Sequence, residues 1–207
     1  MLDRPRGGAH RARFRMNSKL RLVLASGSPR RRELLARAGV DFEFATSDVA
    51  EVRLPGEPAR EFALRMAREK ALAVSARIPD ALVIGADTIV ECDGEILLKP
   101  ADADDARRML RVLSGRPHTV ITAFALARAG AIAAADAVQS RVTFRTLSKR
   151  EIDDYVLSGE PLDKAGAYGI QGAGGGFIAR VDGPRDNVMG LPVEQVLAAL
   201  RRCGVEC

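Results

Sequence analysis

Short apolar runs alternate with helical patterns along most of the chain, and this alternation restricts the fold more than any other feature of the sequence. The runs 20–25 (LRLVLA) and 81–86 (ALVIGA) are continuously apolar and typical of buried strands. Apolar residues recur at helical spacing after Pro58, through about Arg77, and again over 102–113. Strands and helices that alternate in this way predict an α/β fold.

A long antiparallel pair is expected in the second half of the chain. Segments 118–127 and 135–147 read as extended strands on either side of a turn at Gly130. Ser148 and Glu151 have the spacing of a capping box, so a helix is expected directly after the second strand. We therefore predict an elongated mixed β-sheet, part parallel and part antiparallel, flanked by helices.

The first strand, turn and helix form a candidate anion site. The turn carries Ser26 and Ser28, and Ser28 is a suitable N-cap for a helix that begins at Pro29. Free N–H groups at a helix start attract anions, and the forked guanidinium groups of Arg30 and Arg31 can bind phosphate oxygens. A capped surface helix with solvated arginines fits these residues equally well. No Walker loop is present, so this is not a P-loop enzyme.

Asp87 and Thr88 follow the apolar run 81–86 and form a second candidate site. Ligands of open α/β sheets gather at the carboxyl ends of strands. An aspartate at that place can bind a hard cation or accept a proton from water. An aspartate that only begins a turn is the commoner case.

Two lysines are further candidates. Lys70 follows Phe62 by eight residues and Met66 by four, on an apolar helix face. A lysine there either extends outward to solvent, which is the commoner case, or meets a buried anion. Lys99 precedes Pro100 and says little by itself.

The glycine-rich run 160–172 is the last candidate. Glycine lets the backbone approach a ligand closely, and Gln171 can donate and accept hydrogen bonds at the edge of a base. A flexible surface loop is the alternative. The apolar residues Leu162, Tyr168 and Ile170 count against that alternative, because they can anchor the segment.

Composition excludes several classes of protein. With 47% hydrophobic and 29% charged residues, the chain can bury an ordinary core as one domain. Its 3 cysteines indicate a reducing cytoplasm rather than a disulfide framework. No run of 18 apolar residues predicts a membrane span. The 2 histidines, His10 and His118, make a zinc site improbable. Asp and Glu are plentiful, so Mg²⁺ or Mn²⁺ is the natural metal if the protein binds one.

The net charge of +5 suits an anionic ligand. Much of it arises from arginines within residues 1–18, which we predict to be a disordered basic arm. The remainder is close to neutral, so the charge is weak evidence for a nucleic-acid partner. A transit peptide is an alternative interpretation of the arm, and Met16 is a plausible second start.

The ordered set of motifs resembles the Maf family of nucleoside triphosphate pyrophosphatases. Each motif alone is weak, but the set in this order is highly specific, and it extends from about residue 20 to the C-terminus. The predicted domain is therefore 19–207. The matching segments are LASGSPRRRELL at 24–35, Glu51, REKA at 68–71, GADTIV at 85–90, LKP at 98–100, LSGRPH at 113–118, the 160–172 loop and VMGLP at 188–192.

The resemblance implies a Maf/ITPase-like fold with a cleft between two lobes. It implies that a divalent cation, Mg²⁺ or Mn²⁺, assists cleavage of a nucleoside triphosphate into a monophosphate and pyrophosphate. It also implies a role in clearing unwanted nucleotides and a link to septum formation. The segment DKAGAYGIQG at 163–172 resembles the branch that acts on dTTP and UTP rather than the branch that acts on 7-methyl-GTP. The stretch GPRDN at 183–187 departs from the family's usual aromatic-containing pattern.

The resemblance also suggests a role for each candidate residue. The expected ligands of the metal are Glu51 and Asp87, and Asp87 would also orient or deprotonate the attacking water. The expected positive charges at the α/β bridge are Lys70 and Lys99. The expected triphosphate contacts are Ser26, Ser28, Arg30 and Arg31, and the expected base-reading residues are Gln171, Thr88 and Arg31.

Two other hypotheses stay open on the sequence alone. One is a pyrophosphatase for purine or modified-purine triphosphates on the same fold. The other is a non-catalytic nucleotide- or nucleic-acid-binding regulator of division, supported by the basic arm. The oligomeric state also stays open, and a homodimer is compatible with an enzyme of this size.

Overall fold

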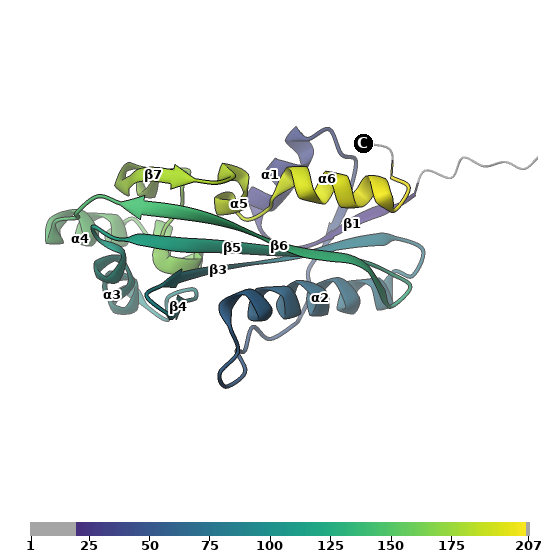
Figure 1. Cartoon of the computed structure of the whole chain (residues 1–207), viewed down its shortest axis with the longest axis horizontal. Coiled ribbons are helices and arrows are strands. Elements are labelled where there is room, and N and C mark those ends of the chain that lie inside the picture. Colours follow the sequence, from purple (N-terminus) through teal and green to yellow (C-terminus); the bar gives the residue numbers. More distant parts are fainter. Residues whose placement is uncertain (1–19, 206–207) are drawn as a thin grey trace, which may run out of the picture.

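A mixed sheet forms the centre of the molecule (Figure 1). The computed structural model describes residues 20–205, and the predicted arm at 1–18 lies outside them. In this described part the sheet has seven strands in the order β2-β1-β3-β5-β6-β7, with β4 paired to β3. The strands are β1 (Leu22–Ala25), β2 (Glu43–Ala45), β3 (Leu82–Cys92), β4 (Glu95–Leu97), β5 (Pro117–Arg128), β6 (Ala131–Phe144) and β7 (Ile178–Asp182).

Helices cover both faces of the sheet (Figure 1). Helix α2 lies below the sheet in that view, whereas α1, α5 and α6 lie above it, and α3 and α4 gather at one end. The helices are α1 (Pro29–Arg37), α2 (Ala59–Arg77), α3 (Ala103–Leu113), α4 (Lys149–Leu157), α5 (Arg185–Met189) and α6 (Val193–Arg202). Three 3₁₀ turns lie in the glycine-rich region, namely η1 (Glu160–Asp163), η2 (Ala165–Ala167) and η3 (Ala173–Phe177). The predicted elongated, mixed α/β fold is confirmed.

Tight turns join the antiparallel strands where the sequence predicts them. Ala129 and Gly130 both have positive φ, of 50° and 77°, as a two-residue hairpin between right-twisted strands requires. The capping box is also present: the Ser148 hydroxyl accepts from the Glu151 backbone, while the Glu151 carboxylate accepts from the Ser148 backbone. These local signals were sufficient to predict their elements.

Strand β3 corrects the prediction that a strand ends at Asp87. It continues to Cys92, because β5 pairs with it antiparallel from Leu82↔Arg128 to Glu91↔Thr119. Asp87 therefore lies within a strand rather than after one. The short helix α5, which begins within the unusual stretch 183–187 and ends at Met189, was not predicted from the sequence.

The edge of β3 has a gap that positions the site. β1 pairs with β3 in parallel only as far as Ala25↔Gly85, and β4 pairs with β3 only from Val90↔Leu97 onward. Between these limits one edge of β3 is left uncovered by a strand. Successive side chains of a strand point to opposite faces, so Asp87 and Thr88 border this gap on different faces of the sheet.

Gly85 brings α2 close to β3. A Cβ at this position would lie 2.3 Å from the Ala67 carbonyl oxygen and 2.6 Å from the Ala71 nitrogen. The helix can therefore rest directly on the strand only because residue 85 has no side chain. This contact sets the height of α2, and with it the position of Lys70.

The apolar core is divided along the length of the sheet. One cluster joins α3, α4 and the ends of β5 and β6 and includes Phe144 and Tyr155, while a second packs α1 and α6 around Leu24 and Leu35. A third lies under α2 and includes Phe62. The gap in the sheet edge lies between these packed regions, in agreement with the predicted two lobes. No helix within residues 20–205 is long and apolar enough to cross a membrane.

Candidate active site

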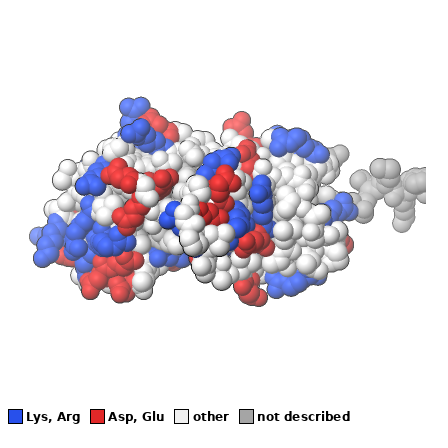
Figure 2. Space-filling view, turned by 60° about the horizontal axis from the view of Figure 1, so that its bottom comes forward, with Lys and Arg blue, Asp and Glu red and all other residues white. Residues whose placement is uncertain are grey.

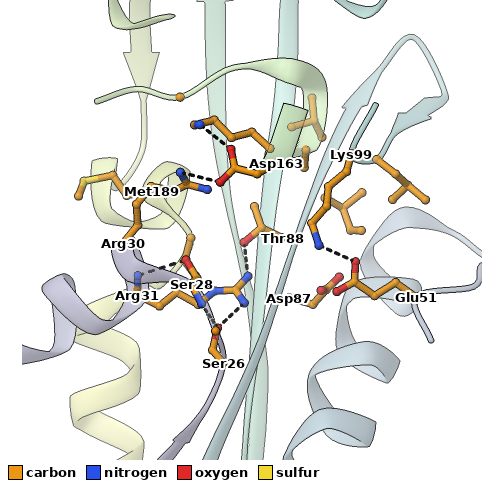
Figure 3. Close-up of a pocket in the computed structure, with 18 of the residues that line it drawn as sticks. Ser26, Ser28, Arg30, Arg31, Glu51, Asp87, Thr88, Lys99, Asp163 and Met189 are labelled. Carbon is orange, nitrogen blue, oxygen red and sulfur yellow. Dashed lines mark hydrogen bonds and ion pairs between the residues drawn. The ribbon is translucent and has the colours of Figure 1, made fainter. Parts of the chain in front are cut away.

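A cavity of about 350 Å³ lies at the gap in the sheet edge (Figure 3). It is bordered by the β1–α1 turn, by α2 and β3, and by the loop around η1 and η2. Nine of the ten predicted site residues line it. They are Ser26, Ser28, Arg30, Arg31, Glu51, Lys70, Asp87, Thr88 and Lys99.

One wall of the cleft is a cluster of two carboxylates and two lysines. The Lys70 ammonium lies 2.6 Å from Asp87 Oδ1 and 2.6 Å from Glu51 Oε1. Lys99 Nζ lies 3.2 Å from the other Glu51 oxygen. The Lys70 side chain is only 8% exposed, so it meets buried anions and does not extend to solvent. The sequence left that choice open, because it depends on the opposing strand.

Burial gives the two carboxylates different acidities. Burial raises the pKa of Asp87, and the positive charges of Lys70 and Arg31 oppose this shift only in part. Burial acts in the same direction on Glu51, but Lys70 and Lys99 outweigh it and leave the pKa of Glu51 below its ordinary value. Asp87 is therefore the better proton acceptor of the two, and Glu51 is the more permanent anion.

The opposite wall is organised by Arg31. Its Nε donates to the Gly190 carbonyl at 2.8 Å, and Nη1 donates to the Ala86 carbonyl at 2.9 Å. Nη2 donates to Thr88 Oγ1 at 3.0 Å (Figure 3). Arg31 thus joins α1, β3 and the end of α5. Most of its donors are used within the protein, so the role of triphosphate clamp is supported less well for Arg31 than for Arg30.

The β1–α1 turn presents hydroxyl groups and a helix start to the cleft. Ser28 caps α1 through its hydroxyl, as predicted. Ser26 Oγ accepts from the Ser28 backbone at 3.2 Å and from Arg31 Nη1 at 3.3 Å. With both lone pairs engaged, the Ser26 proton remains for an incoming acceptor. An anion is favoured here because the first turn of α1 lines the cavity.

Arg30 extends across the cleft to the glycine-rich loop. Its Nη1 lies 3.6 Å from Asp163 Oδ2, and the other Asp163 oxygen lies 2.6 Å from Lys164 Nζ (Figure 3). All three side chains line the cavity. Residue-level reasoning missed Asp163 and Lys164. Their alternation of charge beside a glycine-rich loop was the available signal, but only the fold brings them opposite Arg30.

Gln171 is the one predicted site residue that the structure does not bring to the cleft. It is exposed, whereas its neighbour Ile170 lines the cavity. The base-reading role of Gln171 stays a prediction. Tyr168, which the sequence suggested only as an anchor, does line the cleft and bonds the buried His118 at 2.8 Å.

The donor set of the cleft fits a hard divalent cation that also binds substrate. Asp87 and Glu51 offer carboxylate oxygens on either side of Lys70. No group of three His, Cys, Asp or Glu suitable for a metal is found among residues 20–205. Mg²⁺ is commonly held by one or two carboxylates together with substrate phosphates. Two carboxylates are therefore sufficient, provided the ligand carries phosphate.

Charges of both signs are mixed on the surface of the described residues that Figure 2 displays. Figure 2 shows basic and acidic side chains side by side across the face that it displays, without a continuous basic stripe. A phosphate-backbone binder requires such a stripe. The positive charge of the cleft is instead local and is set around two carboxylates.

The fold and the cleft define an α/β protein built for a small, phosphate-bearing anionic ligand. Comparison with known proteins narrows this class. The family model described as "Maf-like protein" matches residues 21–203, and the chain belongs to this family.

Curated relatives are similar to this chain in sequence over most of its length. A "dTTP/UTP pyrophosphatase" of Anaeromyxobacter dehalogenans is 54% identical over 89% of this chain and 94% of its own length. A protein of the same description from Geobacter metallireducens is 50% identical over 91% of this chain and 99% of its own. A third protein of this description, from Escherichia coli O157:H7, is 52% identical over 86% of this chain and 91% of its own length.

Proposed function

We propose that this chain hydrolyses dTTP and UTP between the α- and β-phosphates and releases the nucleoside monophosphate and pyrophosphate. The single observation that carries the proposal is the buried contact of Lys70 with Asp87 and Glu51, each at 2.6 Å, inside a cleft faced by Arg30 and the start of α1. The relatives described as dTTP/UTP pyrophosphatases support the substrate class.

The reaction needs a base for water. A water oxygen attacks the α-phosphorus, the bond from that phosphorus to the α/β-bridging oxygen breaks, and the pyrophosphate leaves with the electron pair. Asp87 accepts the proton of the water. Its raised pKa suits this role, because a general base works best when its pKa approaches the operating pH. Lys70, at 2.6 Å, fixes the orientation of the carboxylate.

The triphosphate brings about four negative charges, which must be neutralised before water can approach. Arg30 and the α1 start face the cleft from one side, and Lys99 faces it from the other. Arg30 pairs with Asp163, and Lys99 pairs with Glu51. The phosphates would exchange these carboxylate contacts for their own.

A divalent cation, Mg²⁺ or Mn²⁺, would be held by Glu51 and Asp87 together with phosphate oxygens. When bound, it neutralises phosphate charge and makes the nearby water more acidic. Chelation by EDTA should therefore abolish turnover, and added Mg²⁺ or Mn²⁺ should restore it.

Base choice would depend on Thr88, at the centre of the cleft (Figure 3), and on residues of the 163–172 loop. Uracil and thymine carry an N3–H donor between two carbonyl acceptors, whereas cytosine carries an acceptor at N3. A pocket built on hydrogen bonds rejects the wrong pattern strongly, because its own polar groups are then left unpaired.

The test is pyrophosphate release from dTTP, UTP, CTP, GTP and 7-methyl-GTP, with Asp87→Asn as the inactive variant. Asp104→Asn is a matched control, since this aspartate is 93% exposed on α3, away from the cleft. Selective turnover of dTTP and UTP that Asp87→Asn loses and Asp104→Asn keeps is the expected result. Preferred turnover of a purine triphosphate would favour a pyrophosphatase for purine triphosphates. Absence of turnover by the folded protein would refute the proposal that the chain is an enzyme.

A further inference from the structure

A line of hydrogen bonds runs from the cleft into the core behind Thr88. Thr88 on β3 lies directly opposite Thr122 on β5, and their hydroxyl oxygens are 3.0 Å apart. Thr122 Oγ1 donates in turn to the Asn187 carbonyl on α5 at 2.8 Å. Thr122 and Asn187 are both fully buried, whereas Thr88 lines the cleft.

The direction of every bond in this line is fixed by its two ends. A carbonyl oxygen can only accept, so the single proton of Thr122 is committed to Asn187. The proton between the two threonines must therefore come from Thr88. At the other end, a guanidinium group can only donate, so Thr88 accepts from Arg31 Nη2 at 3.0 Å.

This assignment leaves Thr88 with one role toward a ligand. A hydroxyl group has one proton and two acceptor positions. The proton is given to Thr122 and one acceptor position is taken by Arg31. What remains for the cleft is a single acceptor, which can bind a ligand N–H and has no proton for a ligand lone pair.

The buried end of the line is held rigidly. Asn187 Nδ2 donates to the Val120 carbonyl at 3.1 Å and to Ser140 Oγ at 3.0 Å. The helix that carries Asn187 is capped at its C-terminus by Gly190, whose carbonyl accepts from Arg31 Nε at 2.8 Å. Arg31, Thr88, Thr122 and α5 thus close a ring, so the acceptor for the Thr122 proton cannot turn away.

We propose that Thr122, through the Asn187 carbonyl, is a positioning residue that sets substrate specificity by keeping Thr88 an acceptor. The inference rests on the proposed function. An acceptor at Thr88 matches the N3–H of uracil or thymine and repels the N3 lone pair of cytosine. Thr122 does not line the cleft and acts only through Thr88.

The test compares Thr122→Val with Thr122→Ser. Valine has nearly the shape of threonine but offers no acceptor, so the Thr88 proton is free to turn into the cleft and donate to cytosine N3. We expect the ratio of kcat/KM for UTP over CTP to fall about tenfold, mainly through a gain for CTP, because one buried hydrogen-bond mismatch is relieved. Thr122→Ser retains the hydroxyl and should retain the wild-type ratio.

A purely structural role would lower both activities together, so an unchanged ratio in folded Thr122→Val overturns the proposal. Melting temperatures identify the folded variants, and Thr122→Ala replaces Thr122→Val if the latter does not fold. Calorimetric binding of UMP and CMP gives a second readout that needs no turnover. Loss of the UMP preference in the variant supports the role of Thr122, and its retention refutes it. Absence of triphosphate turnover by the wild-type protein refutes the proposed function alone.

Discussion

The contact between α2 and β3 at Gly85 makes a sharp test of how the fold positions the catalytic wall. Alanine at 85 would place its Cβ 2.3 Å from the Ala67 carbonyl oxygen and 2.9 Å from the Ala71 Cβ. Ordinary contacts begin at 3.4 Å, and the nearest obstacles are helix backbone. The helix must therefore withdraw from the strand by about 1 Å, since neither backbone can yield locally.

The expected losses of stability and of activity both follow from this displacement. Overpacking a core by one methyl group costs about 1–3 kcal/mol, and the rigid obstacle favours the upper end, about 3 kcal/mol. Lys70 lies on the same stretch of α2, 2.6 Å from Asp87. A misplacement of about 1 Å at a catalytic group can lower turnover about 100-fold. Gly85→Ala should thus lose both stability and activity.

Urea unfolding and kcat/KM for UTP measure the two losses. Gly176→Ala is the matched control, because a Cβ there meets nothing within 4 Å and the φ of Gly176 is not in the left-handed region. Its unfolding free energy should change by less than about 0.5 kcal/mol, with activity unchanged. If Gly85→Ala had wild-type stability and turnover, the close approach of α2 would not control the position of Lys70.

Three further changes test other parts of the site. Lys70→Met leaves the buried Asp87 carboxylate without its partner and should lower the unfolding free energy by about 3–5 kcal/mol. The double variant Lys70→Met/Asp87→Leu should recover part of this stability. Equal stability of the single and double variants in urea unfolding would contradict this expectation. Burial lowers the pKa of His118 to about 4 from 6.5, so its folded form binds fewer protons than the unfolded chain. About 3 kcal/mol of stability, fully present above pH 6.5, should therefore disappear as the pH falls to about 4, and unfolding curves of His118→Gln should lack this loss. Asp163→Asn removes the carboxylate that competes with phosphate for Arg30 and should lower the KM for UTP about threefold at low salt. In about 0.5 M NaCl the KM values of the variant and the wild-type protein should be equal, because salt screens this ion pair. An unchanged KM at low salt would show that Asp163 does not compete with phosphate for Arg30.

Local signals in the sequence were sufficient for most of the framework. Apolar runs, helical spacing and the turn at Gly130 determined the mixed sheet and its helices, because these features depend on neighbours along the chain. The capping box at Ser148 is of the same kind. The ordered motifs led to the Maf family, which the family comparison confirms.

The burial and the partners of the individual site residues could be read only from the tertiary structure. From the sequence, extension to solvent is the commoner case for a lysine such as Lys70, and only the packing of α2 on β3 brings its ammonium group to Asp87. Asp87 was predicted beyond the end of a strand, because the pairing that extends β3 to Cys92 comes from β5, some thirty residues later. Long-range pairing of this kind leaves no local trace in sequence.

The same reason explains the residues that sequence reasoning did not find. Asp163 and Arg30 are separated by more than a hundred residues, and Thr122 becomes relevant only when it stands opposite Thr88 and beneath Asn187. The sequence determined which residue types are available and which elements carry them. Only the packing of those elements decided which protons are free, which charges are paired, and which side chains face the cleft, because each depends on groups distant in the chain.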